Sequence, residues 1–425
     1  MTLLSKFGKF ESLPHSCIDY THPWTHSCTD AAAGVFVDAV QDSFRIYVTV
    51  YMLALVMRGK IPTKQHLKKT MLGILQSTAF LTTNAYAFML SMCAVRKVLG
   101  SFNFLTVSFI PAFIASYFAI LIERPSRRGL LALYVTNVAS ETLFRMAAKR
   151  GLVTPIPHGE VYIFMVSVSS LLYFFKAQRQ SSSDSVISLL RFVVGPYEEK
   201  DYAENREDLP SPPASRRNLS AAKPWALLAL RHLIARTCRP IVELGAGKMF
   251  SIGYGLQACM TLLLRMKKLV RQPSLLPSLL FSKEAFELGA FLGGFSGIFR
   301  LVSCLLRHIC NKDSKFHAIP AGFLAGTTFY MYPSTTVSLY MMWKMLQVAY
   351  NTGTEVGYVP ELPWATILLY CFSTAVLFHA GVLEPSSLRP SYWKFLLGIS
   401  GGRVLDISRS ATLNFGENHI RLFRR

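Results

Sequence analysis

Histidine and cysteine residues gather near the start of the chain, where His15, Cys17, His22, His26 and Cys28 fall within fourteen residues. Imidazole and thiolate are the usual ligands of structural zinc, so this set could close a metal site, although its spacing matches none of the standard zinc-finger patterns. Cys17 and Cys28 could instead form a disulfide bond, which would require an oxidising compartment. A segment that only caps the first helix is the third interpretation, and the sequence leaves all three open.

A second candidate is a pair of opposite charges, Glu141 and Arg145, which lie one helical turn apart within an apolar stretch. At that spacing the two side chains can pair on one face of a helix. A charged residue inside a membrane is a functional candidate by default, whereas one near a helix end more often reaches for the membrane surface. The pair therefore indicates either part of a transport path or a charge that reaches the surface.

Catalytic signatures are absent from the sequence, which contains no GxSxG, HExxH, phosphate-binding loop or dinucleotide fingerprint. The few carboxylates within apolar segments are not arranged as a general acid and base. We therefore predict that the protein is not an enzyme and that it needs no cofactor.

The elements that would hold these residues are apolar segments close to the ~20 residues needed to cross a bilayer. A hydrophobic content of 51% with only 16% charged residues is typical of a polytopic membrane protein. The first segment is the weakest candidate because it contains Asp42 and Arg45. The five segments before the polar middle of the chain are 39–57, 71–95, 104–122, 129–148 and 161–175.

The net charge of +21 could suggest a nucleic-acid partner. The basic residues, however, fall mainly in short clusters beside the apolar segments. Such clusters orient a membrane protein and attract anionic lipid headgroups. We therefore predict that the partners are the bilayer and anionic lipids at the basic loops, and that nucleic acid is not a partner.

The pattern of the first half returns after the polar middle, which indicates an internal duplication. Pro111–Ser116 resembles Pro320–Gly326, and the pair Pro125 and Ser126 resembles Pro333 and Ser334. We predict an all-α, polytopic membrane bundle built from two duplicated, hairpin-rich halves with about 8–10 membrane segments. The predicted domains are a His/Cys segment (1–38), a first repeat (39–176), a polar linker with short amphipathic helices (177–244), a second repeat (245–383) and a basic tail (384–425).

Small residues spaced four apart predict the faces through which the membrane helices pack. This spacing lets two helix backbones approach closely in lipid, where van der Waals contact rather than the hydrophobic effect holds helices together. The residues concerned are Ala112 and Ser116 in the first half, and Gly289, Gly293, Gly297, Gly322 and Gly326 in the second.

Several stretches resemble the transmembrane protein 135 family, also called peroxisomal membrane protein 52. They are Ala119–Leu131, Glu141–Met146, Leu288–Gly293, His317–Gly326 and Leu388–Leu397. The likeness runs nearly end to end, includes the early His/Cys segment, and fails in the linker at 200–240. The glycine-bearing hairpins are also similar, more weakly, to the four-helix unit of the mitochondrial Tim translocase subunits.

The resemblance to the transmembrane protein 135 family implies a multi-pass protein of mitochondrial and peroxisomal membranes. It also implies a link to mitochondrial fission through the dynamin-related fission GTPase, and links to peroxisome organisation and lipid handling. No catalytic residues come with that family. The expected function is therefore non-enzymatic regulation of the fission and fusion balance and of peroxisome and lipid homeostasis. The alternative is a lipid or small-solute transporter or channel, and the oligomeric state is left open.

Overall fold

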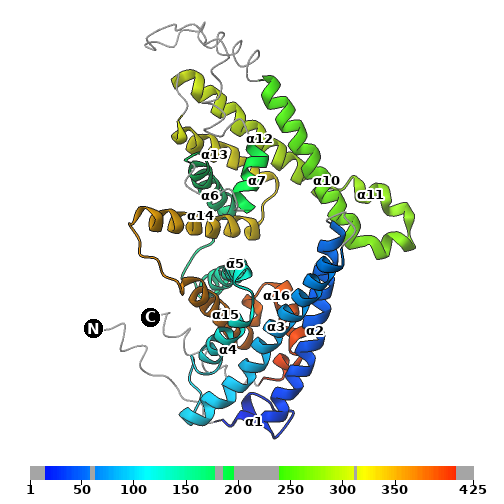
Figure 1. Cartoon of the computed structure of the whole chain (residues 1–425), viewed down its shortest axis with the longest axis vertical. Coiled ribbons are helices and arrows are strands. Elements are labelled where there is room, and N and C mark those ends of the chain that lie inside the picture. Colours follow the sequence, from blue (N-terminus) through cyan, green and yellow to red (C-terminus); the bar gives the residue numbers. More distant parts are fainter. Residues whose placement is uncertain (1–14, 58–62, 178–184, 196–238, 311–313, 408–425) are drawn as a thin grey trace. The chain divides into compact units, whose positions relative to one another are not determined.

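A computed structural model describes residues 15–57, 63–177, 185–195, 239–310 and 314–407 of the chain. Every regular element within these ranges is a helix, so the predicted all-α class is confirmed (Figure 1). Most of the predicted linker, including its amphipathic piece at 225–235, and the end of the basic tail lie outside the described residues.

The described ranges contain the following helices, with short turns and 3-10 segments between most of them. The α-helices are α1 (Cys17–Tyr20), α2 (Cys28–Met57), α3 (Lys64–Leu99), α4 (Phe109–Ile122), α5 (Pro125–Lys149), α6 (Gly159–Lys176), α7 (Ser185–Val194), α10 (Arg239–Arg271), α11 (Leu276–Leu280), α12 (Lys283–Cys310), α13 (Ala318–Gly326), α14 (Thr335–Val356), α15 (Ala365–Leu383) and α16 (Pro390–Ile399). The 3-10 segments are η3 (Pro273–Leu275), η4 (Lys315–His317), η5 (Thr327–Met331), η6 (Pro385–Ser387) and η7 (Arg403–Leu405).

Four helices in the described part of the chain are long and apolar enough to cross a membrane. They are α3, α6, α15 and the stretch Leu276–Arg307, which joins α11 to most of α12. Helix α4 is equally apolar but has only 14 residues. Helices α5 and α14 are long, but polar side chains such as Asn137 and Lys344 lie on their buried faces. The larger number of membrane segments stays a prediction.

The chain divides into two compact units, and the division differs from the predicted repeats at one helix in each half. Unit 1 contains Met1–Pro155 and Leu362–Arg425, whereas unit 2 contains Ile156–Glu361. Helix α6 closes the predicted first repeat but packs in unit 2, on α13 and α14. Helix α15 closes the predicted second repeat but packs in unit 1, on α4 and α5.

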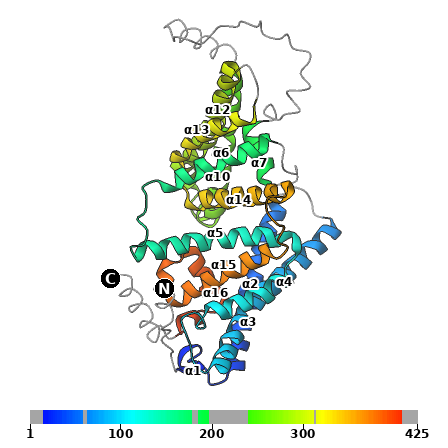
Figure 2. The same ribbon diagram turned by 90° about the vertical axis from the view of Figure 1, so that its left-hand side faces the viewer.

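Unit 1 is a layered bundle in which α15 lies against both α4 and α5 (Figure 2). Helix α3 packs along α2 on one side and α4 on the other. The core at this junction contains Ala119 and Ile120 of α4 and Leu377 and Ala380 of α15, all fully buried. Alanines on both helices leave room for the larger Ile120 and Leu377 side chains in this core.

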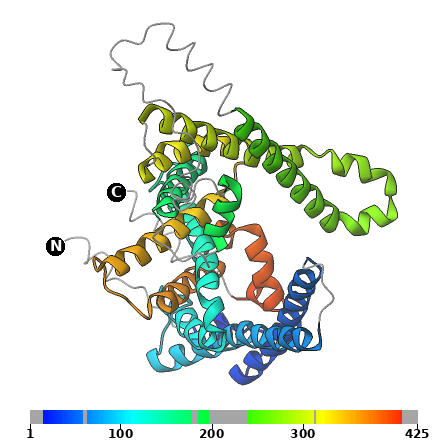
Figure 3. The ribbon, with the colours of Figure 1, turned by 45° about the horizontal axis from the view of Figure 1, so that its top comes forward.

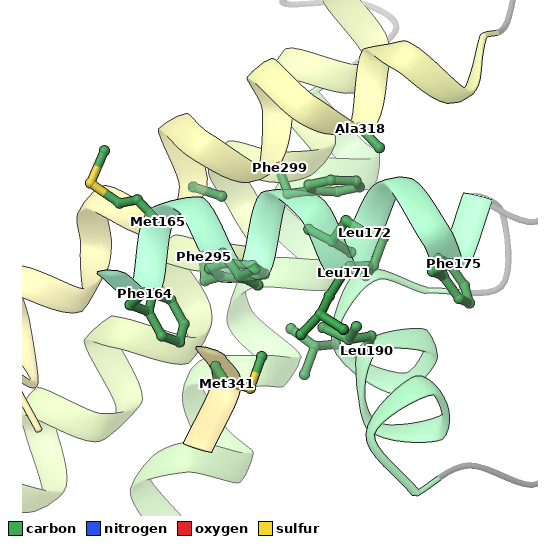
Figure 4. Packing of buried hydrophobic residues seen from close by; sticks show 14 of the residues in the cluster. Phe164, Met165, Leu171, Leu172, Phe175, Leu190, Phe295, Phe299, Ala318 and Met341 are labelled. Atoms are coloured by element: carbon green, nitrogen blue, oxygen red, sulfur yellow. The ribbon is translucent and has the colours of Figure 1, made fainter. Parts of the chain in front are cut away.

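Unit 2 is organised around α6 and the long pair α10 and α12, which lie side by side (Figure 3). From α6, Phe164 stacks on Phe329 of η5, with ring centroids 4.1 Å apart. Figure 4 shows Leu171 beside Leu190, a residue of α7. Helix α7 corresponds to one of the short amphipathic helices predicted in the linker, and its apolar side chains lie in the core of unit 2.

The two units repeat one pattern of helix contacts. In unit 1, α4 contacts α3 and α15, and α5 contacts α15. In unit 2, α13 contacts α12 and α6, and α14 contacts α6. The pattern matches if α3, α4, α5 and α15 correspond to α12, α13, α14 and α6. A duplication in which the halves exchange their last helix would produce this arrangement, and the duplication itself stays a prediction.

The glycines of α12 lie where its backbone meets that of α10. A Cβ atom on Gly293 would lie 3.0 Å from the carbonyl oxygen of Ala246, and one on Gly289 would lie 3.1 Å from that of Phe250. From the other helix, a Cβ on Gly253 would lie 2.9 Å from the carbonyl oxygen of Leu288. The close approach of α10 and α12 therefore depends on glycine, because a side chain at these positions would meet the backbone of the other helix.

A second close crossing joins α13 to α6. Cβ atoms on Gly322 and Gly326 would lie 2.9 Å from the Cα atoms of Ser169 and Met165, respectively. The remaining residues predicted to pack helices are buried, namely Ala112, Ser116 and Gly297.

Candidate functional site

The segment before α2 brings two cysteines to the first positions of helices. Ser16 caps α1 through a reciprocal pair of hydrogen bonds with Asp19, which starts the helix at Cys17. Ser27 precedes α2, and its hydroxyl accepts a hydrogen bond from the amide of Asp30. Capping of this kind fixes where a helix begins, and here it fixes the position of both thiols.

A group of four side chains with metal-ligating atoms forms where this segment meets α3. The thiols of Cys17, Cys28 and Cys93 and an imidazole nitrogen of His22 all lie within 4.8 Å of one another. Cys93 comes from α3, and both it and His22 are buried. Burial, followed by the nearness of Cys28, raises the pKa of the Cys17 thiol above its ordinary value.

The imidazole of His22 is held in one orientation. Its Nδ1 lies 2.9 Å from the carbonyl oxygen of Thr25, which can only accept a hydrogen bond, so Nδ1 carries the proton. The Nε2 atom of the neutral ring is then an acceptor, and it lies 3.3 Å from Sγ of Cys28. The side chain of His22 is fully buried, with the ring of Trp24 set edge-on beside it.

The structure brings together some of the histidines and cysteines that the sequence analysis singled out, but not all of them. Cys17, His22 and Cys28 come together, whereas the exposed His15 and His26 lie outside the group. Both cysteines of the predicted alternative disulfide are free thiols in the structure. Cys93 was missed because it lies in an apolar helix, where a cysteine is usually a small packing residue.

Glu141 lies at the centre of a charge network in unit 1. Its Oε1 accepts a hydrogen bond from Arg145 Nη2 at 2.5 Å, and its Oε2 pairs with Arg389, just before α16. Glu141 is 7% exposed, so both carboxylate oxygens are paired away from water. One turn further along the same surface, Arg150 pairs with Glu384, which precedes η6. The network ties the second half of α5 to the segment after α15.

A similar network holds the turn between α4 and α5 against α3. Glu123 is 1% exposed and accepts a hydrogen bond from Ser77 of α3 at 3.3 Å. Arg127 Nη1 lies 3.5 Å from the same carboxylate oxygen and 2.5 Å from the Ser77 hydroxyl, and it also donates to the phenol of Tyr51 at 2.9 Å. This turn is therefore fixed by charge as well as by its proline.

A cavity of about 160 Å³ lies inside unit 1, among α2, α3, α5, α15 and α16. Its walls are largely apolar, with contributions from Phe80, Phe378 and Leu396. One polar contact crosses it, where the amide nitrogen of Asn84 donates to the hydroxyl of Tyr370 at 3.2 Å, and Asn84 Oδ1 has no hydrogen-bond partner. The Thr374 hydroxyl oxygen on the same wall also lacks a hydrogen-bond partner, and an apolar space with a few such polar atoms suits an amphiphilic molecule.

A comparison with known protein families matches the part of the chain that contains the Cys/His group and most of the unit 1 helices. Residues 14–148 match the family model described as the N-terminal cysteine-rich region of Transmembrane protein 135. This range contains all four residues of the Cys/His group, together with Glu123, Glu141 and Arg145. No solved structure matches the chain.

Proposed function

We propose that the chain is a multi-pass membrane protein of the Transmembrane protein 135 family, because residues 14–148 match that family's cysteine-rich region and four described helices are long and apolar enough to cross a membrane. From this we propose that it is a non-enzymatic protein of mitochondrial and peroxisomal membranes that regulates the balance of mitochondrial fission and fusion, and peroxisome and lipid homeostasis. It acts as a membrane scaffold, and its soluble partner is the dynamin-related fission GTPase. The weaker similarity to the Tim translocase subunits stays a prediction.

The pairing of Glu141 is the observation that carries the scaffold proposal. A carboxylate that transfers protons or accompanies a solute has to exchange partners with water or substrate. Both oxygens of Glu141 are instead bound by Arg145 and Arg389, and its side chain is almost fully buried. Such a carboxylate supports the position of helices rather than chemistry.

The basic residues support a role at an anionic membrane surface. Lys64, Lys68 and Lys69 at the start of α3 are exposed. Lysines at a membrane boundary attract anionic headgroups, each by about 1 kcal/mol. We take this end of α3 as the lipid-contacting part of the scaffold.

The cavity of unit 1 favours a second candidate, which is lipid binding or transfer. A cavity of about 150 Å³ in another protein accommodates benzene, so the observed volume suits part of an acyl chain. A neighbouring cavity of about 70 Å³ shares Ala85, Phe378 and Leu396 with it and extends the apolar space.

The proposal is tested by a rescue series in cells that lack the protein, with mitochondrial length and protein abundance measured in the same cells. Removing the charge of Glu141 leaves two arginines without their carboxylate, which costs about 3 kcal/mol and lowers abundance. Gly322→Leu lowers abundance by another route, since it separates α13 from α6. If the protein is a scaffold, the rescue of mitochondrial length should depend only on protein abundance. Glu141→Gln and Gly322→Leu should then fall on the same curve when mitochondrial length is plotted against abundance.

A transport role for Glu141 would give a different result. If Glu141→Gln rescues much less than Gly322→Leu at equal abundance, the carboxylate has a role beyond folding and the transporter alternative replaces the scaffold. Mitochondria of normal length in cells without the protein would contradict the proposed function as a whole.

A further inference from the structure

We infer that Cys17, His22, Cys28 and Cys93 bind one structural Zn²⁺ ion, which fastens the segment before α2 to the end of α3. Four donors meet at one point, one each from α1, the loop after it, α2 and α3, and the sequence distance between Cys28 and Cys93 excludes a local turn motif as the cause. The inference does not depend on the role in organelle dynamics.

The spacing of the donor atoms fits a tetrahedral zinc site. With Zn–S near 2.3 Å and Zn–N near 2.0–2.1 Å, a tetrahedron places two sulfurs about 3.8 Å apart and a nitrogen about 3.6 Å from a sulfur. The observed separation of His22 Nε2 and Cys28 Sγ is 3.3 Å, and no pair in the group exceeds 4.8 Å. Side-chain shifts of about 1 Å or less would therefore close the site.

The surroundings of His22 are those of a metal ligand. Its Nδ1–H is bound to the Thr25 carbonyl, so Nε2 offers its lone pair to the centre of the group. Metal-bound histidines almost always have such a partner on the second nitrogen, because it fixes both the tautomer and the ring orientation. The second nitrogen, Nε2, lies 3.3 Å from the Cys28 sulfur, and the thiols of Cys17 and Cys93 are close by.

A helix N-terminus and a guanidinium lie beside the group and could offset the negative charge of a metal–thiolate centre. Cys28 is the first residue of α2, a helix of 30 residues, and the N-terminus of a helix stabilises a negative charge. Arg96 lies one turn beyond Cys93 on α3, where its Nε donates to the carbonyl oxygen of His15 at 2.8 Å. Three thiolates with a divalent cation carry one net negative charge, which this guanidinium can offset.

The donor set identifies the ion. Three sulfurs and one imidazole nitrogen form one of the common structural zinc sets, whereas calcium and magnesium require oxygen ligands. The protein supplies all four donors, so the ion has no open position for a substrate, and a structural role follows. Binding would join α1 and the loop after it to α3, and would hold the α2–α3 pair together at that end.

The test uses the full chain purified in detergent without chelators, with zinc measured by mass spectrometry of the metal. We expect about one zinc per chain, and at least a roughly fivefold lower content in Cys93→Ser. His22→Ala should also lose zinc, whereas His22→Cys should keep it, since four thiolates are another common zinc set. Cys371→Ser is the matched control, because Cys371 is a buried free thiol of α15 outside the group.

A second measurement covers the case in which the ligand variants fail to fold. In the wild-type chain, zinc should protect Cys17, Cys28 and Cys93 from alkylation, and a chelator should make all three reactive together. Equal zinc content in wild type and Cys93→Ser would overturn the inference. So would a Cys17–Cys28 disulfide in the purified chain, or retention of zinc by His22→Ala.

Discussion

The crossing of α10 and α12 gives the sharpest test of the packing in unit 2. In Gly293→Leu, the new Cβ atom alone would lie 3.0 Å from both the Ala246 carbonyl oxygen and the Phe250 Cβ. Ordinary contacts of a Cβ atom begin near 3.4 Å, and leucine adds three further carbons that the same crossing must accommodate. The helices must therefore separate, and overpacking of this kind costs about 1–3 kcal/mol.

The assay is thermal unfolding in detergent, followed by the loss of a monodisperse peak in size-exclusion chromatography. Gly293→Leu should lower the apparent melting temperature by about 2–12 °C, the shift that this cost produces in a unit of this size. Gly255→Leu on α10 is the control, because a Cβ at Gly255 has no neighbour within 4 Å. It should be neutral or slightly stabilising, since leucine favours helix over glycine. Equal melting temperatures for the two variants would refute the close crossing.

Two further predictions concern unit 1. Ala85→Phe should fill the cavity and so reduce the labelling of the protein by a lipid that carries a photoactivatable acyl chain. Leu75→Phe, at an exposed position of α3, is the control and should leave the labelling unchanged. Undiminished labelling of Ala85→Phe would show that the lipid binds elsewhere. Glu123→Gln should destabilise the protein by about 3 kcal/mol, because Arg127 loses its buried carboxylate. The measurement is again the melting temperature, and an unchanged value would show that the ion pair contributes little.

The Cys/His group shows where sequence reasoning reaches its limit. Cys17, His22 and Cys28 could be proposed as ligands because they are close along the chain. The choice of His22 over His26 depends on the loop that brings the Thr25 carbonyl to its ring, and spacing alone does not contain this information. Cys93 joins the group only because α3 packs along α2, so a helix pairing had to be known first.

The charged residues divide in the same way between local and distant contacts. Arg145 follows Glu141 by one turn, so the sequence predicted that contact from helix geometry alone. Arg389 reaches the other oxygen because of the path between α15 and α16. The glycine spacing likewise indicated faces for close packing, but it could not name the partner helices. The helical period determines which residues share one face of a helix, whereas the fold determines which other helix packs on that face.

The exchange of α6 and α15 between the predicted halves has a consequence for biosynthesis. Helices α4 and α5 are complete once Lys149 has been made, yet their partner α15 begins only at Ala365. At ordinary rates of translation this interval lasts on the order of 10–40 s. During this interval the hydroxyl of Thr136 on α5 lacks the Ser373 hydroxyl, which lies 2.9 Å from it in the folded protein. The faces of α4 and α5 that pack on α15 therefore lack their partner helix until synthesis is nearly over.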